Sequence, residues 1–347
     1  MFIKARLSLF IFPFLLCSAA ISARHQGPEN QPGSGRIVLD VVVTPKSGQP
    51  VSGFHQQDFT LLNNKVPQPL ASFQAVDGRQ AQAEVILLVD AVNTGYQSVA
   101  FERGEIDKFL RVDRGNLAHP TALAVLTDTG IQTQEGFSND GNALSASLDQ
   151  YTVGLRNIRR DTGFYGAAER FQLSLKGLHD LAAREASHPG RTIIVWISPG
   201  WPLLSGANVE LDTKQQQQLF GDVVSLSKQL QQARITLYSV DPLGTADTGI
   251  HTSYWKSFTK GISKPSQVHA GDLGLEVLAT QSGGLALSSN NDVAAELQKC
   301  VADAASYYEI SFNPPPGDQP NEYHRLEIRV AKPGMTARTR QGYYSQP

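Results

Sequence analysis

The stretch EVILLVDAVNTGY, residues 84–96, places a polar loop directly after an apolar run. The five residues before Asp90 are all apolar, which is typical of a strand buried on both faces of a parallel sheet. Asp90 ends this strand, and Asn93 and Thr94 follow in the loop. These side chains fit a metal site at the carboxyl end of the strand, because hard cations bind carboxylate, amide and hydroxyl oxygens. They fit a capped turn equally well, since turns use the same residue types.

Buried strands alternate with amphipathic helices from about residue 84 to 305. Other apolar strands end in LTDTG, ISPGWP and VDPLG, and helical spacing is clear in VAFERGEIDKFLRV and YGAAERFQLSLKGLHDLAARE. This alternation predicts right-handed βαβ crossovers and an α/β domain with a doubly wound, mostly parallel sheet. In such sheets, ligands bind outside the carboxyl ends of the strands, where the strand order reverses.

The two ends of the chain follow a β pattern instead. Residues 36–80 contain short β-rich runs such as IVLDVVVT, and residues 306–347 alternate in SYYEISFNP and EYHRLEIRVA. We expect both segments to form a small β-sandwich-like domain, with the α/β domain inserted into it or stacked on it. A separate hairpin formed by the tail is the alternative.

The composition fits a packed globular protein. Of the 347 residues, 41% are hydrophobic and 18% are charged, and the formal net charge is −2. These values exclude a disordered chain. No Lys/Arg run with interleaved aromatic residues is present, so nothing indicates a nucleic acid as partner.

Residues 1–24 have the pattern of a secretory signal, and residues 25–35 that of a polar linker. Two basic residues precede the apolar LSLFIFPFLLC, and the small residues of SAAISA follow it. We therefore expect an exported protein of the periplasm, the outer envelope or the medium. A membrane is a partner only if the signal is retained or Cys17 is lipidated.

Catalytic signatures are missing from the sequence. It has no dinucleotide fingerprint, P-loop, nucleophile elbow or H-E-x-x-H motif, and its eight histidines are scattered. Cys300, the one cysteine left after signal removal, lies in an apolar helical pattern and is expected to be a buried hydrophobe. We expect a protein that is not an enzyme.

Oxygen-bearing side chains on two loops form the candidate metal site. The first loop supplies Asp90, Asn93 and Thr94, and the second supplies Asp161 and Thr162 just before a long helix. One carboxylate with two hydroxyls and several waters suits Mg²⁺. In the alternative, Thr162 caps the helix that follows it.

At these residues the chain resembles a known family. The α/β region looks like a von Willebrand factor type A (VWA) domain, and residues 36–346 resemble the VWA-related exported proteins known mainly from Acidobacteria. The resemblance is carried by VVVTPKSGQPVSGFHQQDFTLLNN, LLVDAVNT, RTIIVWISPGWP, LYSVDPLG and the ending SYYEISFNP…RQGYY. It implies a role in adhesion or protein binding.

The resemblance also implies a metal-ion-dependent adhesion site, which this chain matches in part. Where the family has D-x-S-x-S, the chain has DAVNT, so Asp90 matches, Thr94 keeps a hydroxyl and Val92 replaces a serine. Thr162 is the candidate for the family's second-loop threonine, and Pro199 stands where the family has an aspartate. The implied site for Mg or Ca is therefore degenerate, with a metal bound weakly or not at all. Its expected ligands are Asp90, Asn93, Thr94 and Thr162.

Four residues mark the expected partner-binding rim: Asp128, Pro199, Trp201 and Trp255. Trp201 either is exposed at this rim or packs beneath the loop that follows it. Trp255 belongs to the long segment 243–270, which is low in apolar residues and is either a partner contact or a surface excursion.

These patterns together predict an exported adhesion or protein-binding module whose protein partner meets the carboxyl-end rim of the sheet. Two alternatives stay open. One is an envelope hydrolase that uses segment 243–270 as a lid, and the other is an inert structural component of an envelope complex.

Overall fold

The computed structural model describes residues 35–46, 48–78, 83–154, 163–188, 190–202, 211–244, 255–288 and 290–345. The chain divides into two compact units, Met1–Gly35 and Arg36–Pro347, and the second is described below. The expected signal (1–24), together with Asp161 and Thr162, lies outside the described residues. None of the helices described is long and apolar enough to cross a membrane.

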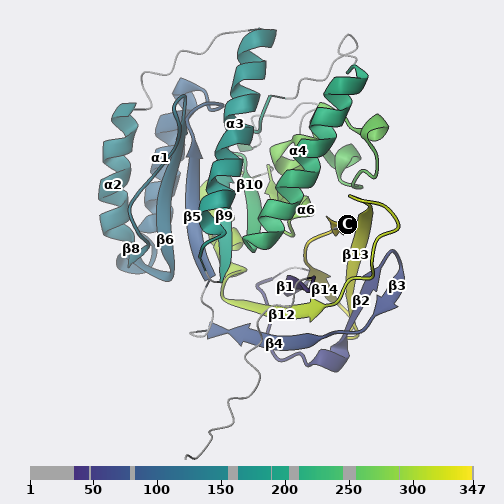
Figure 1. The fold of residues 1–347 in the computed structure, drawn as a ribbon. Coiled ribbons are helices and arrows are strands. Elements are labelled where there is room, and N and C mark those ends of the chain that lie inside the picture. The colour runs from purple at the N-terminus through teal and green to yellow at the C-terminus, as the bar shows by residue number, and fades with distance from the viewer. Residues whose placement is uncertain are drawn as a thin grey trace, which may run out of the picture. The chain divides into compact units, whose positions relative to one another are not determined.

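A mostly parallel sheet forms the centre of this unit (Figure 1). Its strands follow the order β11-β10-β9-β5-β6-β7, and β8 pairs with β6. Only β7 and β8 run antiparallel to their neighbour. The strands are β5 (Ala83–Asp90), β6 (Asn116–Thr127), β7 (Gly130–Thr133), β8 (Ser138–Asp140), β9 (Arg191–Ile197), β10 (Ile235–Val240) and β11 (Ala286–Leu287).

Helices cover both faces of the sheet, because alternate residues of each buried strand point to opposite sides. On β5, Val85 and Leu87 pack with α1, α2 and α7, whereas Ile86 and Leu88 pack with α3, α4 and α6. Figure 1 shows α3 and α4 lying across the second face. The helices are α1 (Tyr96–Leu110), α2 (Gly141–Gly154), α3 (Phe164–Glu185), α4 (Thr213–Gln232), α6 (Leu275–Gln281) and α7 (Val293–Ala302). Short 3-10 turns are η1 (Gln56–Asp58), η3 (Val112–Gly115), η6 (Trp255–Phe258), η7 (Pro265–Gln267) and η8 (Ala270–Leu273).

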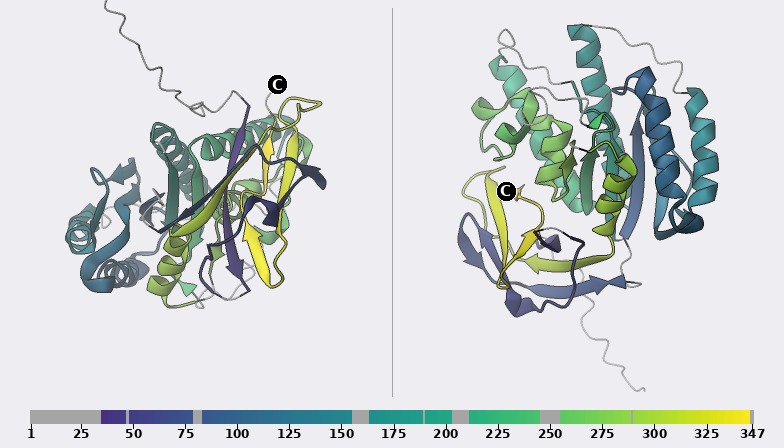
Figure 2. Two further views of the ribbon diagram at one scale, coloured as in Figure 1. Left: turned by 90° about the horizontal axis from the view of Figure 1, so that it is seen from below. Right: turned by 180° about the vertical axis from the view of Figure 1, so that it is seen from behind.

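Two four-stranded sheets built from both ends of the chain share a separate core. One has the order β14-β1-β12-β4 and the other β15-β13-β2-β3. Figure 2 shows the purple N-terminal and yellow C-terminal strands side by side, as their pairing requires. Their inward residues, among them Leu39, Leu61, Ile310 and Ile328, form one apolar cluster. The strands are β1 (Ile37–Pro45), β2 (Phe59–Asn63), β3 (Val66–Gln68), β4 (Ser72–Asp77), β12 (Ser306–Phe312), β13 (Tyr323–Val330), β14 (Met335–Arg338) and β15 (Gly342–Tyr344).

A buried polar cluster joins these strands to the α/β layers. Arg338 of β14 donates to the carboxylate of Asp303, which lies after α7, and to the carbonyl of Gly283. The hydroxyl of Tyr238 on β10 donates to the same carboxylate at 2.5 Å. Because Asp303 is buried, these donors compensate a charge that water does not reach.

The predicted fold class is confirmed. The central sheet is mostly parallel, and the strands of the β-sandwich-like part come from both ends of the chain. The proposed limits of the individual domains stay predictions. The spacing in VAFERGEIDKFLRV predicts Phe101 on the same side of its helix as Ile106, Phe109 and Leu110. This prediction is wrong for Phe101, which is 46% exposed, whereas the other three are buried. Phe101 lies in the second turn of α1.

Candidate functional site

The carboxyl edge of the central sheet contains a topological switch point between β5 and β9. The chain leaves β5 toward α1 on one face, whereas it leaves β9 toward α4 on the other. Diverging loops of this kind open the place where α/β sheets bind ligands. Asp90 is the last residue of β5, and Ser198 directly follows β9, so both lie at this point.

Asp90 is fully buried, and five donors surround its carboxylate. Oδ1 accepts the backbone N–H groups of Val92 (3.0 Å) and Asn93 (2.8 Å), which closes the loop back onto the strand. Oδ2 accepts the Asn93 side-chain amide (2.8 Å), the Trp196 indole N–H (3.0 Å) and the Ser198 hydroxyl (2.9 Å). The carboxylate therefore fixes its own loop and ties it to β9.

This donor set does not fit Mg²⁺ or Ca²⁺. A carboxylate offers about four lone-pair positions, and all are taken by hydrogen-bond donors. The indole of Trp196 has an N–H and no lone pair, so it cannot become a ligand. Two buried oxygens, Asn93 Oδ1 and Thr94 Oγ1, have no hydrogen-bond partner, but they add no negative charge to the loop. Thr162, the expected fourth ligand, is outside the described part of the chain.

The expected rim residues differ in accessibility. Asp128 is exposed after β6, Pro199 is half-buried after β9, and Trp255 is half-buried in η6. Trp201 is 4% exposed and packs edge-on against Trp196 and Phe171, with ring centroids 5.1 and 6.4 Å away. Its side chain thus belongs to the core under the rim, which was one of the two alternatives.

Sequence reasoning missed three residues at this edge. Trp196 and Ser198 donate hydrogen bonds to Asp90. In the sequence, Trp196 looks like an ordinary residue of a buried strand, and Ser198 like part of the turn that follows it. Tyr165 is 87% exposed in the first turn of α3, where it read as the start of an amphipathic helix. The 22-residue helix α3 ends just before β9 begins, so its first turn lies at the carboxyl edge of the sheet.

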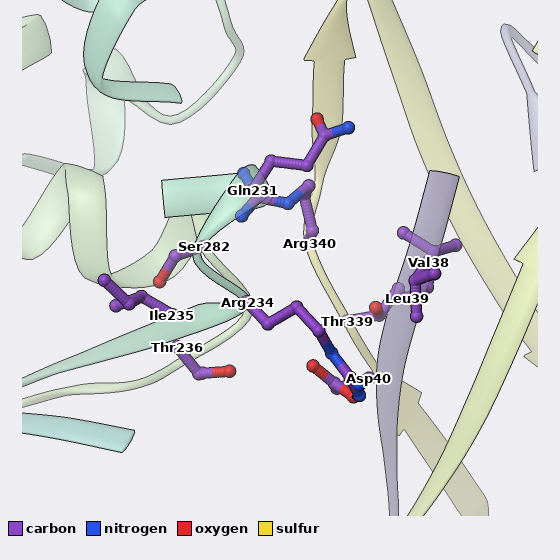
Figure 3. A pocket seen from close by; sticks show the side chains of 10 residues that line it. All are labelled: Val38, Leu39, Asp40, Gln231, Arg234, Ile235, Thr236, Ser282, Thr339 and Arg340. Carbon is purple, nitrogen blue, oxygen red and sulfur yellow. The ribbon is translucent and has the colours of Figure 1, made fainter. Parts of the chain in front are cut away.

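A small cavity lies elsewhere, where β1 approaches the end of α4 (Figure 3). Its volume is about 20 Å³, and roughly 10–15 Å³ is needed for one water molecule. Arg234 points across it to Asp40, with a nitrogen–oxygen distance of 2.5 Å. Burial lowers the pKa of Arg340, on the cavity wall, to about 10. The cavity suits bound water between charged groups rather than a substrate.

No family model and no curated protein matches this sequence. Solved structures that resemble the chain include a human COPII-coat protein, Sec24c (8% identity, TM-score 0.37, 79% of this chain and 44% of that chain). They also include the VWA domain of SpRpn10 (13%, 0.30, 62% and 95%) and the pilus adhesin SpaC from Lactobacillus rhamnosus GG (9%, 0.36, 84% and 49%). The chain spans less than half the length of Sec24c and of SpaC. Similarities this low carry no functional conclusion, and the fold class rests on the observed strand order.

Proposed function

We propose that this chain is an exported, non-catalytic protein-interaction module of the VWA-related type, and that its carboxyl-end rim contacts a protein partner without a metal ion. The observation that carries the proposal is the contrast at this edge between a saturated Asp90 and an 87% exposed Tyr165. A carboxylate that accepts five hydrogen bonds is a structural anchor. It is poorly suited to act as a general base or as a metal ligand.

The exposed side chains near the rim suit a protein interface. Tyr165 lies in the first turn of α3 and Phe101 in the second turn of α1, and Asp128 is exposed on the loop after β6. Aromatic residues are enriched at the centres of protein interfaces, because they bury a large area at a low cost in side-chain entropy. Tyrosine also offers a hydroxyl for a hydrogen bond to the partner.

Site-specific photocrosslinking tests the proposal. A benzophenone amino acid is placed at position 165 in the full chain, expressed in its native cells, and adducts are identified by mass spectrometry. The matched control carries the same group at Val66, which is 59% exposed on β3, in a different sheet from the one whose rim is tested. We expect a discrete protein adduct from position 165 and none from position 66. Equal labelling at both positions, or none at 165, contradicts the proposal.

A further inference from the structure

Three side chains of metal-binding type meet at the amino edge of the central sheet, opposite the edge that holds Asp90. They are Glu84, the second residue of β5; Glu185, the last residue of α3; and His188, three residues later. One ligand atom from each lies within 4.8 Å of the other two. The group is independent of the rim and of its proposed partner.

The spacing within this group already approaches that of a metal site. His188 Nδ1 and Glu185 Oε2 are 3.1 Å apart. In a tetrahedral zinc site with bonds of about 2.0–2.1 Å, two ligand atoms are separated by roughly 3.3 Å. An ion can therefore replace the hydrogen bond between them with little movement, and a side-chain rotation brings Glu84 to the same ion.

The charge balance of the group favours a cation. Glu185 is 1% exposed, and Arg184 Nε donates to its Oε1 at 3.0 Å, which compensates one carboxylate. The guanidinium of Arg184 is held in turn by Thr133 at 2.6 Å. The group also lies at the carboxyl end of α3, where the helix dipole is negative.

We propose that Glu84, Glu185 and His188 bind one divalent transition-metal ion of the Zn²⁺ class. Imidazole nitrogen with carboxylate oxygen is a zinc donor set, whereas Mg²⁺ and Ca²⁺ take oxygen ligands. The His188 side chain is 45% exposed and Glu84 is half-buried, so water completes the coordination shell from solvent. The ion joins the start of β5 to the segment after α3 and stabilises that edge of the sheet.

The test uses the full chain after removal of metal with a chelator. Zinc chloride is titrated by calorimetry, and cobalt chloride by visible absorption, which reports a low-coordinate nitrogen and oxygen shell. We expect one bound equivalent and a higher unfolding temperature with zinc, because a ligand that binds only the folded state stabilises it. Magnesium chloride is expected to give neither effect at this group.

Two variants connect the binding to these residues. His188→Ala and Glu84→Gln are each expected to weaken zinc affinity. Loss of a residue that only supports a metal ligand costs roughly 10–100-fold in affinity, and loss of a direct ligand should cost at least as much. The control His55→Ala removes an exposed histidine just before η1, outside the proposed group, and should leave affinity unchanged. Circular dichroism confirms that each variant folds. If His188→Ala fails to fold, the zinc affinity of Glu84→Gln tests the proposal. Absence of zinc binding, or equal binding in wild type and both variants, overturns the proposal.

Discussion

The indole nitrogen of Trp196 donates a 3.0 Å hydrogen bond to Oδ2 of Asp90 across the neighbouring strands β9 and β5. Trp196 lies opposite Leu88 in the register, so its ring reaches two residues along β5 to the end of that strand. Both residues are fully buried. A buried carboxylate requires hydrogen-bond donors, and here the indole of Trp196 supplies one of them. A cation could take the place of this donor only if the indole ring moved away.

Trp196→Phe tests the weight of this bond. The change keeps an aromatic ring but removes the N–H, and hydrogen bonds to charged groups contribute about 1.5–3 kcal/mol. Trp201→Phe is the matched control, because Trp201 is also buried and its Nε1 has no hydrogen-bond partner. In urea unfolding we expect Trp196→Phe to cost about 1.5–3 kcal/mol more than Trp201→Phe. Equal losses of stability in the two variants would mean that the hydrogen bond contributes nothing and that both indole rings stabilise the protein only by filling space.

The position of Asp90 was predictable, whereas its partners were not. A continuous apolar run in an alternating β and α pattern indicates a parallel strand, and the residue after such a run lies at the carboxyl edge. Trp196 is 106 residues away in the chain, and only the register of β5 with β9 brings its ring to the carboxylate. Sequence periodicity records which residues are buried but not which strands are neighbours.

The exposure of the helix starts was equally hidden. Phe101 fits the apolar spacing of its helix and Tyr165 begins an amphipathic stretch, yet both are exposed, in the second turn of α1 and the first turn of α3. Helical periodicity predicts which side of a helix is apolar, but it does not predict which turns of that side pack against the sheet. The sandwich-like strands were easier to predict, because period-2 alternation identifies half-buried strands at both ends of the chain.

Stability in magnesium gives a second prediction. Because the hydrogen bonds of Asp90 are already made by protein donors, millimolar Mg²⁺ should leave the unfolding temperature equal to that in NaCl of the same ionic strength. Asp90→Asn should instead lower stability to the same extent with and without the metal, since an amide NH₂ then faces donors that need an acceptor. A stabilisation by Mg²⁺ that disappears in Asp90→Asn would restore the metal-dependent interpretation of the loop.

The Arg338–Asp303 pair gives a third prediction. Arg338→Met leaves Asp303 with Tyr238 as its remaining side-chain donor, and breaking a buried ion pair costs about 3–5 kcal/mol. We expect a loss near the lower end, about 3 kcal/mol, because the Arg338 side chain is still 23% exposed. Denaturant unfolding measures this loss. Arg325→Met, on an exposed strand position, should stay within about 0.5 kcal/mol of wild type. A small loss in both variants would show that the pair contributes little.

Asp272, in η8, should make stability depend on pH between about 4 and 6. Burial raises its pKa from the ordinary range to about 6, against the opposing effects of the His269 backbone N–H and side chain. Between these values the folded state holds a proton that the unfolded state has released, so stability is fully present below about pH 4 and falls as pH rises through about 6. Asp272→Asn keeps an oxygen for the 2.7 Å bond from His269 N and should flatten this part of the curve. Urea midpoints from pH 4 to 7 measure it, with the exposed Asp128→Asn as control. A slope that persists in Asp272→Asn would assign the pH dependence to another group.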